Sequence, residues 1–171
     1  FGFIGRYAVT HTVVYFIAGL IFSILVNYRE LFATTAYSYM RPFDHPLVIL
    51  GPLLNLFRGA LLAVAFVPFR KVIVESKRGW LYLFGALWIL TNVGADAADP
   101  GKIEGFIYGD YTLGLHLATV PEFTVQTLAF AWIFHTWERN PNYKRVSIPL
   151  IAALVIVVVV AILGLLFTPP A

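Results

Sequence analysis

Two residues of opposite charge lie inside long apolar segments and are the first candidates for chemistry. Arg58 lies in GPLLNLFRGALL (residues 51–62), and Glu122 lies in LHLATVPEFTVQTL (residues 115–128). An unpaired charge in lipid hydrocarbon costs about 2.5–3.5 kcal/mol even on the lenient insertion scale. An arginine binds a carboxylate through two parallel hydrogen bonds, whether the carboxylate belongs to the protein or to a ligand. The two residues therefore predict an internal ion pair, an anion-binding site, or both.

Depth along the helix axis favours a contact between these two charges. With a rise of about 1.5 Å per residue, Arg58 and Glu122 lie within a few ångströms of the same depth. We therefore expect Glu122 to be the partner of Arg58. Two roles stay open for the pair, because a buried ion pair can fix helix register without binding any ligand.

Further polar residues accompany the two charges and predict a polar crevice. Asn55 precedes Arg58 by three residues and Gln126 follows Glu122 by four, spacings that place side chains on one helix face. Pro52 and Pro121 each free backbone carbonyls that need other partners. We expect a crevice that opens outward between the second, third and fourth membrane spans. Its candidate ligand-binding residues are Arg58, Glu122, Asn55, Gln126, Asn92 and Asp96.

Histidines provide a weaker indication of chemistry. His45 and His116 accompany carboxylates in the outer loops, but none has the spacing of an HExxH metal site, so no metal site is expected. His11 and His135 lie toward the inner ends of two spans, where bis-histidine haem ligation is a minor alternative. A third alternative is an intramembrane enzyme in which Glu122 and the rim histidines perform acid–base chemistry. No catalytic residue is assigned and no cofactor is expected. The rim carboxylates are Glu30, Asp44, Asp96, Asp99 and Glu104.

Composition identifies the class of protein that must position these residues. Of the 171 residues, 60% are hydrophobic and only 12% are charged, whereas a soluble domain carries about 25% charged residues. A chain this short has too little interior to bury so much apolar surface. It contains no cysteine, which excludes disulfides and thiolate chemistry. The formal charge of +3 is spread over short clusters between apolar runs, so no nucleic-acid partner is expected. The sequence predicts an integral membrane protein.

Five segments have the length and apolar character of membrane spans. About 20 apolar residues cross a bilayer core of about 30 Å, and prolines at 46, 68, 100 and 149 lie near the expected boundaries. Of the twelve basic residues, one precedes the first span, four lie in the second loop and three in the fourth, compared with three on the opposite side. The positive-inside rule then places the N-terminus in the cytoplasm and the C-terminus outside, in a plasma or inner cell membrane. The predicted spans are 8–26, 47–67, 80–98, 113–136 and 148–167.

The predicted fold is a single all-α membrane domain over residues 1–171, with a four-helix core and a peripheral fifth helix. The fifth helix has no polar face, which suits contact with lipid, with a second copy of the chain or with a larger membrane complex. Gly59 is expected to allow close helix packing, as are the small residues Gly19 and Ser23. The glycines at 101, 105 and 109 predict a turn-rich cap rather than a helix.

These observations lead to three hypotheses of function. The first is the binding or movement of a small anionic or amphipathic solute, or a lipid, through the outward crevice. In that case Arg58 is the anion contact and Glu122 is its counter-charge or a proton carrier. The second is an accessory or assembly subunit of a larger membrane complex, with a purely structural ion pair. The third is the intramembrane enzyme.

Overall fold

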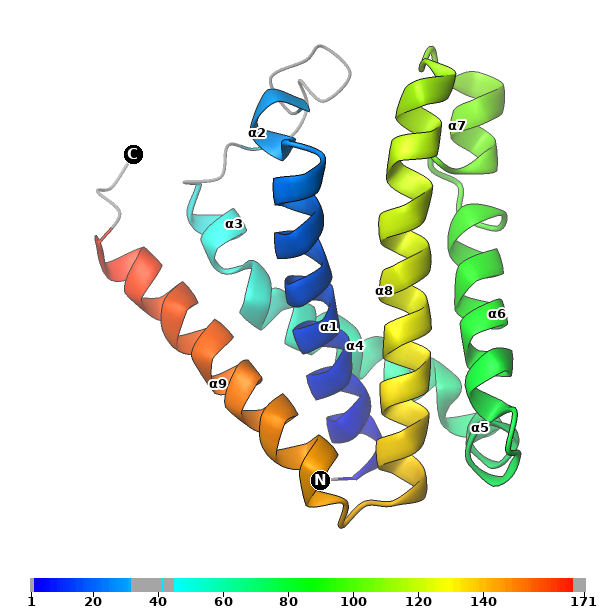
Figure 1. Ribbon diagram of the computed structural model, residues 1–171, viewed down its shortest axis with the longest axis vertical. Helices are drawn as coiled ribbons and strands as arrows, with labels where there is room; N and C mark the ends of the chain where they lie inside the picture. The colour runs from blue at the N-terminus through cyan, green and yellow to red at the C-terminus, as the bar shows by residue number, and fades with distance from the viewer. Residues whose placement is uncertain (1, 32–40, 42–44, 168–171) are drawn as a thin grey trace.

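The computed structural model describes residues 2–31, 41 and 45–167, and all regular secondary structure in that part of the chain is helical (Figure 1). The fold class predicted from the sequence, an all-helical chain, is confirmed. The helical elements are α1 (Phe3–Leu25), α2 (Tyr28–Leu31), α3 (Pro46–Ile49), α4 (Gly51–Phe66), the 3₁₀ turn η2 (Val67–Phe69), α5 (Arg70–Glu75), α6 (Gly79–Asn92), α7 (Ile103–Tyr108), α8 (Leu113–Arg139) and α9 (Lys144–Phe167).

Four helical segments are long and apolar enough to cross a membrane. They are α1, the continuous run from Gly51 to Glu75, α8 and α9, with lengths of 23, 25, 27 and 24 residues. The third predicted span is shorter than expected, because α6 has 14 residues. At about 1.5 Å per residue such a helix is about 21 Å long, less than the thickness of a bilayer core. Five spans are therefore not confirmed.

Prolines explain two differences from the predicted boundaries. The second span was expected to start at Leu47, but the helix is interrupted at Leu50, because Pro52 lies in the first turn of α4 and has no N–H to donate. Pro68 was expected to end this span. It is instead accommodated in the first turn of η2, where a missing N–H leaves no bond unmade, and the helical run continues to Glu75.

The expectation of a cap without a helix was wrong. Residues 103–108 form α7, which lies beside the first turns of α8 (Figure 1), with Phe106 and His116 rings 5.2 Å apart. Two glycines make this fold possible. Gly101 has a φ of +83°, and a Cβ at Gly105 would collide with the carbonyl oxygen of Asp99. The glycine-rich segment therefore forms a tight turn followed by a short helix.

The helices form a bundle with two distinct ends. One end contains the first residues, α5 and the turn between α8 and α9, and we name it the basal end; the opposite end is formed by α7 and the start of α8 (Figure 1). Helix α1 packs against α4, α8 and α9, and α6 packs against α8. In the most apolar 18-residue stretch of α1, 39% is buried inside the bundle, whereas in the corresponding stretch of α9 only 11% is buried. Helix α1 is therefore the central helix of the bundle.

An aromatic cluster fills the bundle toward the basal end. Tyr7 lies 4.6 Å from Phe130 and 5.1 Å from Phe134 between ring centroids, and Phe3 lies 5.3 Å from Phe134. The buried core around these rings draws residues from α1, α4, α5, α6 and α8. A second, smaller cluster of Val9, Val13, Trp137 and Leu150 joins α9 to α1 and α8.

Gly59 sets the close approach of α4 to α1. A Cβ at this position would lie 3.0 Å from the Cα of Ala8 and 3.1 Å from Cδ2 of His11. Gly59 is buried, as expected of a small residue at a helix–helix contact. Gly19 was expected to play the same role, but a Cβ there would meet no atom within 4 Å among the described residues.

Candidate functional site

One cavity lies between α1, α4, α6 and α8, and we name it the inner cavity. Its volume is about 200 Å³. It is bounded toward the basal end by Tyr7 and Phe130, which belong to the aromatic core. The residues that line it are Tyr7, His11, Val14, Tyr15, Arg58, Leu62, Leu87, Thr91, Phe123, Gln126, Thr127 and Phe130.

Two buried polar atoms of the inner cavity have no hydrogen-bond partner within the described part of the chain. They are Oη of Tyr7 and Nε2 of His11. Tyr7 is fully buried, with 0% of its surface exposed. A buried polar group without a partner costs about 1–3 kcal/mol. Since Arg58 lines the same cavity, three polar groups there have room for a ligand or for water.

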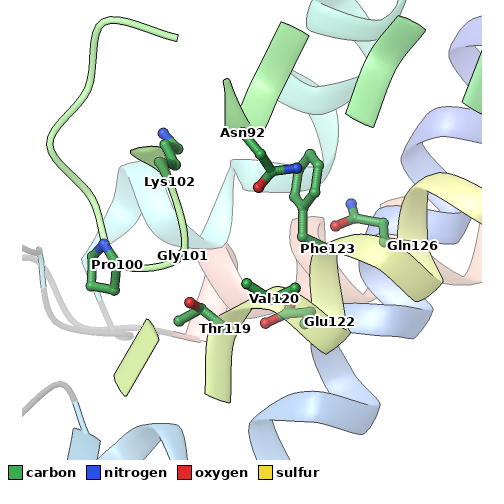
Figure 2. A pocket seen from close by; sticks show the side chains of 9 residues that line it. All are labelled: Asn92, Pro100, Gly101, Lys102, Thr119, Val120, Glu122, Phe123 and Gln126. Carbon is green, nitrogen blue, oxygen red and sulfur yellow. The ribbon is translucent and has the colours of Figure 1, made fainter. Parts of the chain in front are cut away.

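The second cavity lies nearer the α7 end, and we name it the outer cavity (Figure 2). Its volume is about 210 Å³. In Figure 2 the turn that carries Lys102 forms one side of it, and Asn92, Phe123 and Gln126 form the opposite side. Its lining residues are Asn92, Pro100, Gly101, Lys102, Thr119, Val120, Glu122, Phe123 and Gln126.

Hydrogen bonds fix the walls of the outer cavity. The backbone N–H of Gly101 donates to Nδ1 of His116 over 2.9 Å, which attaches the turn after α6 to α8. Nε1 of Trp88 donates to Oγ1 of Thr124 over 3.0 Å, which joins α6 to α8. The positive φ of Gly101 directs the chain back toward α8. The irregular backbone between α6 and α7 thus lines a cavity, where such backbone is tolerated within a membrane protein.

The two cavities meet at the side chains of Phe123 and Gln126, which line both. The periodicity of α8 explains this arrangement. Residues 123, 126, 127 and 130 follow helical spacing along the face toward α1 and α4. Residues 119, 122, 123 and 126 follow the same spacing along the face toward the turn after α6. Phe123 and Gln126 lie on the boundary between the two faces.

Arg58 and Glu122 are not partners, contrary to the expectation from the sequence. Within the described residues no ion pair joins them, and each lines a different cavity. A contact requires more than a similar depth in the bundle. The two side chains must also point toward each other from their respective helices. Glu122 is one residue away from the face that Phe123 presents to the Arg58 cavity, a rotation of about 100° on an α-helix.

The structure brings together part of the predicted site. Asn92 and Gln126 line the outer cavity with Glu122, and Gln126 also lines the inner cavity with Arg58. Asn92 is buried, and its Nδ2 donates to the carbonyl oxygen of Trp88 over 2.8 Å. Asn55 and Asp96 line neither of these two cavities. Asp96 is exposed in the segment that follows α6.

The histidines do not converge on Glu122. His116 accepts from Gly101, and Nδ1 of His45 accepts from the N–H of Leu47 at the start of α3. Nε2 of His135 lies 3.0 Å from the carbonyl oxygen of Ser76. In the described segments no group of three or more His, Asp or Glu side chains is arranged to hold a metal ion. Asp44, one of the predicted rim carboxylates, lies outside the described residues.

Sequence reasoning missed two features of the molecule. Tyr7 was not considered as a cavity residue, although Tyr7, His11 and Tyr15 recur at intervals of four on a mainly apolar helix, a spacing that places them on one face. Glu138 was counted only as a loop charge. Its side chain is fully buried and accepts hydrogen bonds from Arg6 and Arg70 at the basal end.

The four long apolar helices are compatible with a helical membrane protein. No protein-family model, no curated protein and no solved structure matches this chain.

Proposed function

We propose that the protein binds or moves a small anionic or amphipathic solute, or a lipid, through the two cavities. The observation that carries the proposal is the inner cavity. There Arg58 lies with the unpartnered Oη of Tyr7 and Nε2 of His11. A cation beside a hydroxyl donor is the chemistry that binds carboxylate or phosphate oxygens.

The position of Arg58 supports an anionic ligand. Arg58 is exposed on α4, and no carboxylate pairs with it among the described residues. A charge within a membrane span needs a partner or water. A ligand that brings its own negative charge would supply the partner that Glu122 was expected to be.

In this proposal, the side of the membrane from which a ligand reaches the cavities depends on how α6 crosses the membrane and on which end of the bundle faces the cytoplasm. In this proposal α6 and the non-helical segment after Asn92 together complete a third crossing of five, and α9 lies at the edge of a core formed by the other spans. The basic residues of the basal end then face the cytoplasm under the positive-inside rule. The outer cavity lies nearer the α7 end, which is the outer side in this orientation.

Thermal unfolding of the purified full chain in detergent tests the proposal. Inorganic phosphate and decanoate serve as anionic probes, and the native tryptophans provide the fluorescence signal. Binding to the folded state raises the unfolding midpoint. We expect at least one probe to raise it in the parent protein and not in Arg58→Gln. Arg78→Gln, which removes an exposed cation outside both cavities, serves as the matched control. A shift that persists in Arg58→Gln, or no shift with either probe, would overturn the proposal.

A subunit of a larger membrane complex is the second candidate, and the surface of α9 favours it. Large apolar side chains are exposed along this helix, including Ile156 at 62% and Val160 at 62%. Lipid or another protein can cover such a face. The partner in this case is a second copy of the chain or a different membrane protein, and the buried polar residues would then serve packing alone.

A further inference from the structure

We infer that the ligand of the two cavities is zwitterionic, with its anionic group at Arg58 and its cationic group at Glu122. This inference rests on the proposed function, because it names the ligand class of the same site. It depends on three observations: the size of the cavities, the wall that they share, and the charges that remain unpaired in each.

Each of the two cavities is smaller than a typical small-molecule site. The inner cavity holds about 200 Å³ and the outer about 210 Å³. Small-molecule sites in proteins usually have volumes of about 300–1,000 Å³. Neither cavity reaches this range alone. Phe123 and Gln126 line both cavities, so a ligand that extended past these two side chains would have both volumes available.

The inner cavity is suited to the anionic group. Arg58 is the cation of its lining, and neither Asp nor Glu belongs to the set of residues that form it. Oη of Tyr7 is buried and free to donate, and Nε2 of His11 is likewise without a partner within the described chain. The amide of Gln126 lies on the shared wall and adds a further donor.

The outer cavity is suited to the cationic group, although a lysine also lines it. Nζ of Lys102 lies 2.5 Å from a carboxylate oxygen of Asp99, so its charge is already balanced. Glu122 has no ion pair within the described residues and is half-buried. When Glu122 is ionised, the remaining unpaired charge of this cavity is therefore negative. Phe123 adds an aromatic ring to the same wall, a group that attracts ammonium and quaternary ammonium ions.

The ligand class follows from the order of the charges. An anionic group near Arg58 and a cationic group near Glu122 are separated by the shared wall of Phe123 and Gln126. A phosphocholine-like or betaine-like molecule has this arrangement. Such a group occurs both in free solutes and in lipid headgroups, so the experiment separates these sources.

Three probes that share parts of one structure test the inference. Glycerophosphocholine carries both charges, glycerol 3-phosphate carries only the anionic group, and choline carries only the cationic group. The readout is the unfolding midpoint of the full chain in phospholipid-free detergent. We expect glycerophosphocholine to raise the midpoint by a few degrees, glycerol 3-phosphate to raise it less, and choline to leave it nearly unchanged.

Two variants assign the charges to their residues. Glu122→Gln should remove the advantage of glycerophosphocholine over glycerol 3-phosphate while keeping the response to the anion. Arg58→Gln should remove both responses. Asp96→Asn is the matched control, because Asp96 is an exposed carboxylate near the outer cavity that does not line it. This control should respond to all three probes as the parent does.

Failure of the inference is distinguishable from failure of the proposed function. Equal stabilisation by glycerol 3-phosphate and glycerophosphocholine, lost in Arg58→Gln, would overturn the zwitterion and leave an anion site. The zwitterion would also be overturned if Glu122→Gln left the response to glycerophosphocholine unchanged. The same conclusion would follow if decanoate gave an Arg58-dependent response and glycerophosphocholine gave none. Loss of every Arg58-dependent response to phosphate and decanoate would overturn the proposed function itself.

Nanodiscs identify the source of the zwitterion. With a lipid headgroup as the ligand, phosphatidylcholine discs should stabilise the protein more than phosphatidylglycerol discs, and added glycerophosphocholine should have no further effect in phosphatidylcholine. With a free solute as the ligand, glycerophosphocholine should raise the midpoint equally in both kinds of disc. Each result supports a zwitterion and assigns its origin. Greater stabilisation by phosphatidylglycerol, lost in Arg58→Gln, would contradict it.

Discussion

Oε2 of Glu138 lies 2.5 Å from Nε of Arg6, which joins the first turn of α1 to the last turn of α8 by a buried ion pair. Oε1 of the same carboxylate accepts from Nη2 of Arg70 over 2.9 Å and so adds α5. The side chain of Glu138 is 0% exposed, compared with 9% for Arg6 and 54% for Arg70. One carboxylate therefore connects three helices at the basal end.

Replacing Glu138 should destabilise the protein strongly. Glu138→Gln leaves the buried charge of Arg6 without its carboxylate, and removal of one partner of a buried pair costs about 3–5 kcal/mol. Arg70→Met should cost about 1 kcal/mol or less, because that arginine is mostly exposed. Unfolding in detergent, followed by circular dichroism, measures both effects. Glu75→Gln, an exposed acid on α5, is the control. Equal stability of Glu138→Gln and the control would contradict a structural role for this carboxylate.

Gly59 should tolerate no larger side chain. Gly59→Val places new atoms against Ala8 and His11 across the contact of α1 with α4, and overpacking of this kind costs about 1–3 kcal/mol. Gly19→Ala is the matched control in a neighbouring helix, because a Cβ at Gly19 meets no atom within 4 Å among the described residues. The control should be neutral or stabilising by up to about 1 kcal/mol, since alanine favours a helix over glycine. If both variants unfold at the same temperature, close approach at Gly59 is not required.

Orientation can be measured by labelling single cysteines in this cysteine-free chain. Lys77→Cys lies near the basal end and Tyr108→Cys lies at the end of α7, and both positions are exposed. An impermeant thiol reagent on intact cells should label position 108, and should label position 77 only after permeabilisation. The reverse pattern would show that the basic loops face outward and that the predicted orientation is wrong.

Truncation tests whether α9 is dispensable for the remaining bundle. The aromatic core draws its residues from α1, α4, α5, α6 and α8, and none of its buried members lies on α9. A chain that ends after Arg145 should therefore fold in detergent, with lower stability because the cluster of Val9, Val13 and Trp137 loses Leu150. Circular dichroism and size-exclusion chromatography measure helix content and dispersity, and loss of an oligomer peak would assign the contact to α9. An aggregated chain without a folded fraction would contradict the prediction.

The all-helical fold and its long apolar helices could be predicted from the sequence, because apolar residues run over whole segments of about 20 residues. The residues at which the helices begin and end could not be predicted from the sequence. Pro68 was expected to end the second span and Pro52 to lie inside it, yet Pro68 is accommodated in a continuing helical run and the helix is interrupted just before Pro52. The outcome depends on local turn geometry, which proline alone does not determine. Helix α6 ends at Asn92 because the following segment folds back toward α8 through Gly101, a long-range contact.

The types of the residues predicted a polar interior, but they did not predict which polar side chains contact one another. Depth along a helix can be counted in the sequence, and it placed Arg58 and Glu122 at similar levels. The direction in which each side chain points depends on how the helices are rotated against one another. That rotation is set by packing at contacts such as Gly59 with Ala8, which no single-helix pattern contains.

A double-mutant cycle on Arg58 and Glu122 tests whether the two charges are separate. If they formed a buried pair, Arg58→Met and Glu122→Gln would each strand the other charge, and the double variant would recover part of the loss. In the structure they line different cavities and share no ion pair. The two changes in unfolding free energy should therefore add to within about 0.5 kcal/mol, as they do for residues without a common contact. Phosphate and decanoate should be omitted, because a bound anion would couple the sites. A coupling energy of about 1 kcal/mol or more in ligand-free detergent would restore the direct pair and remove the free arginine on which the anion site depends.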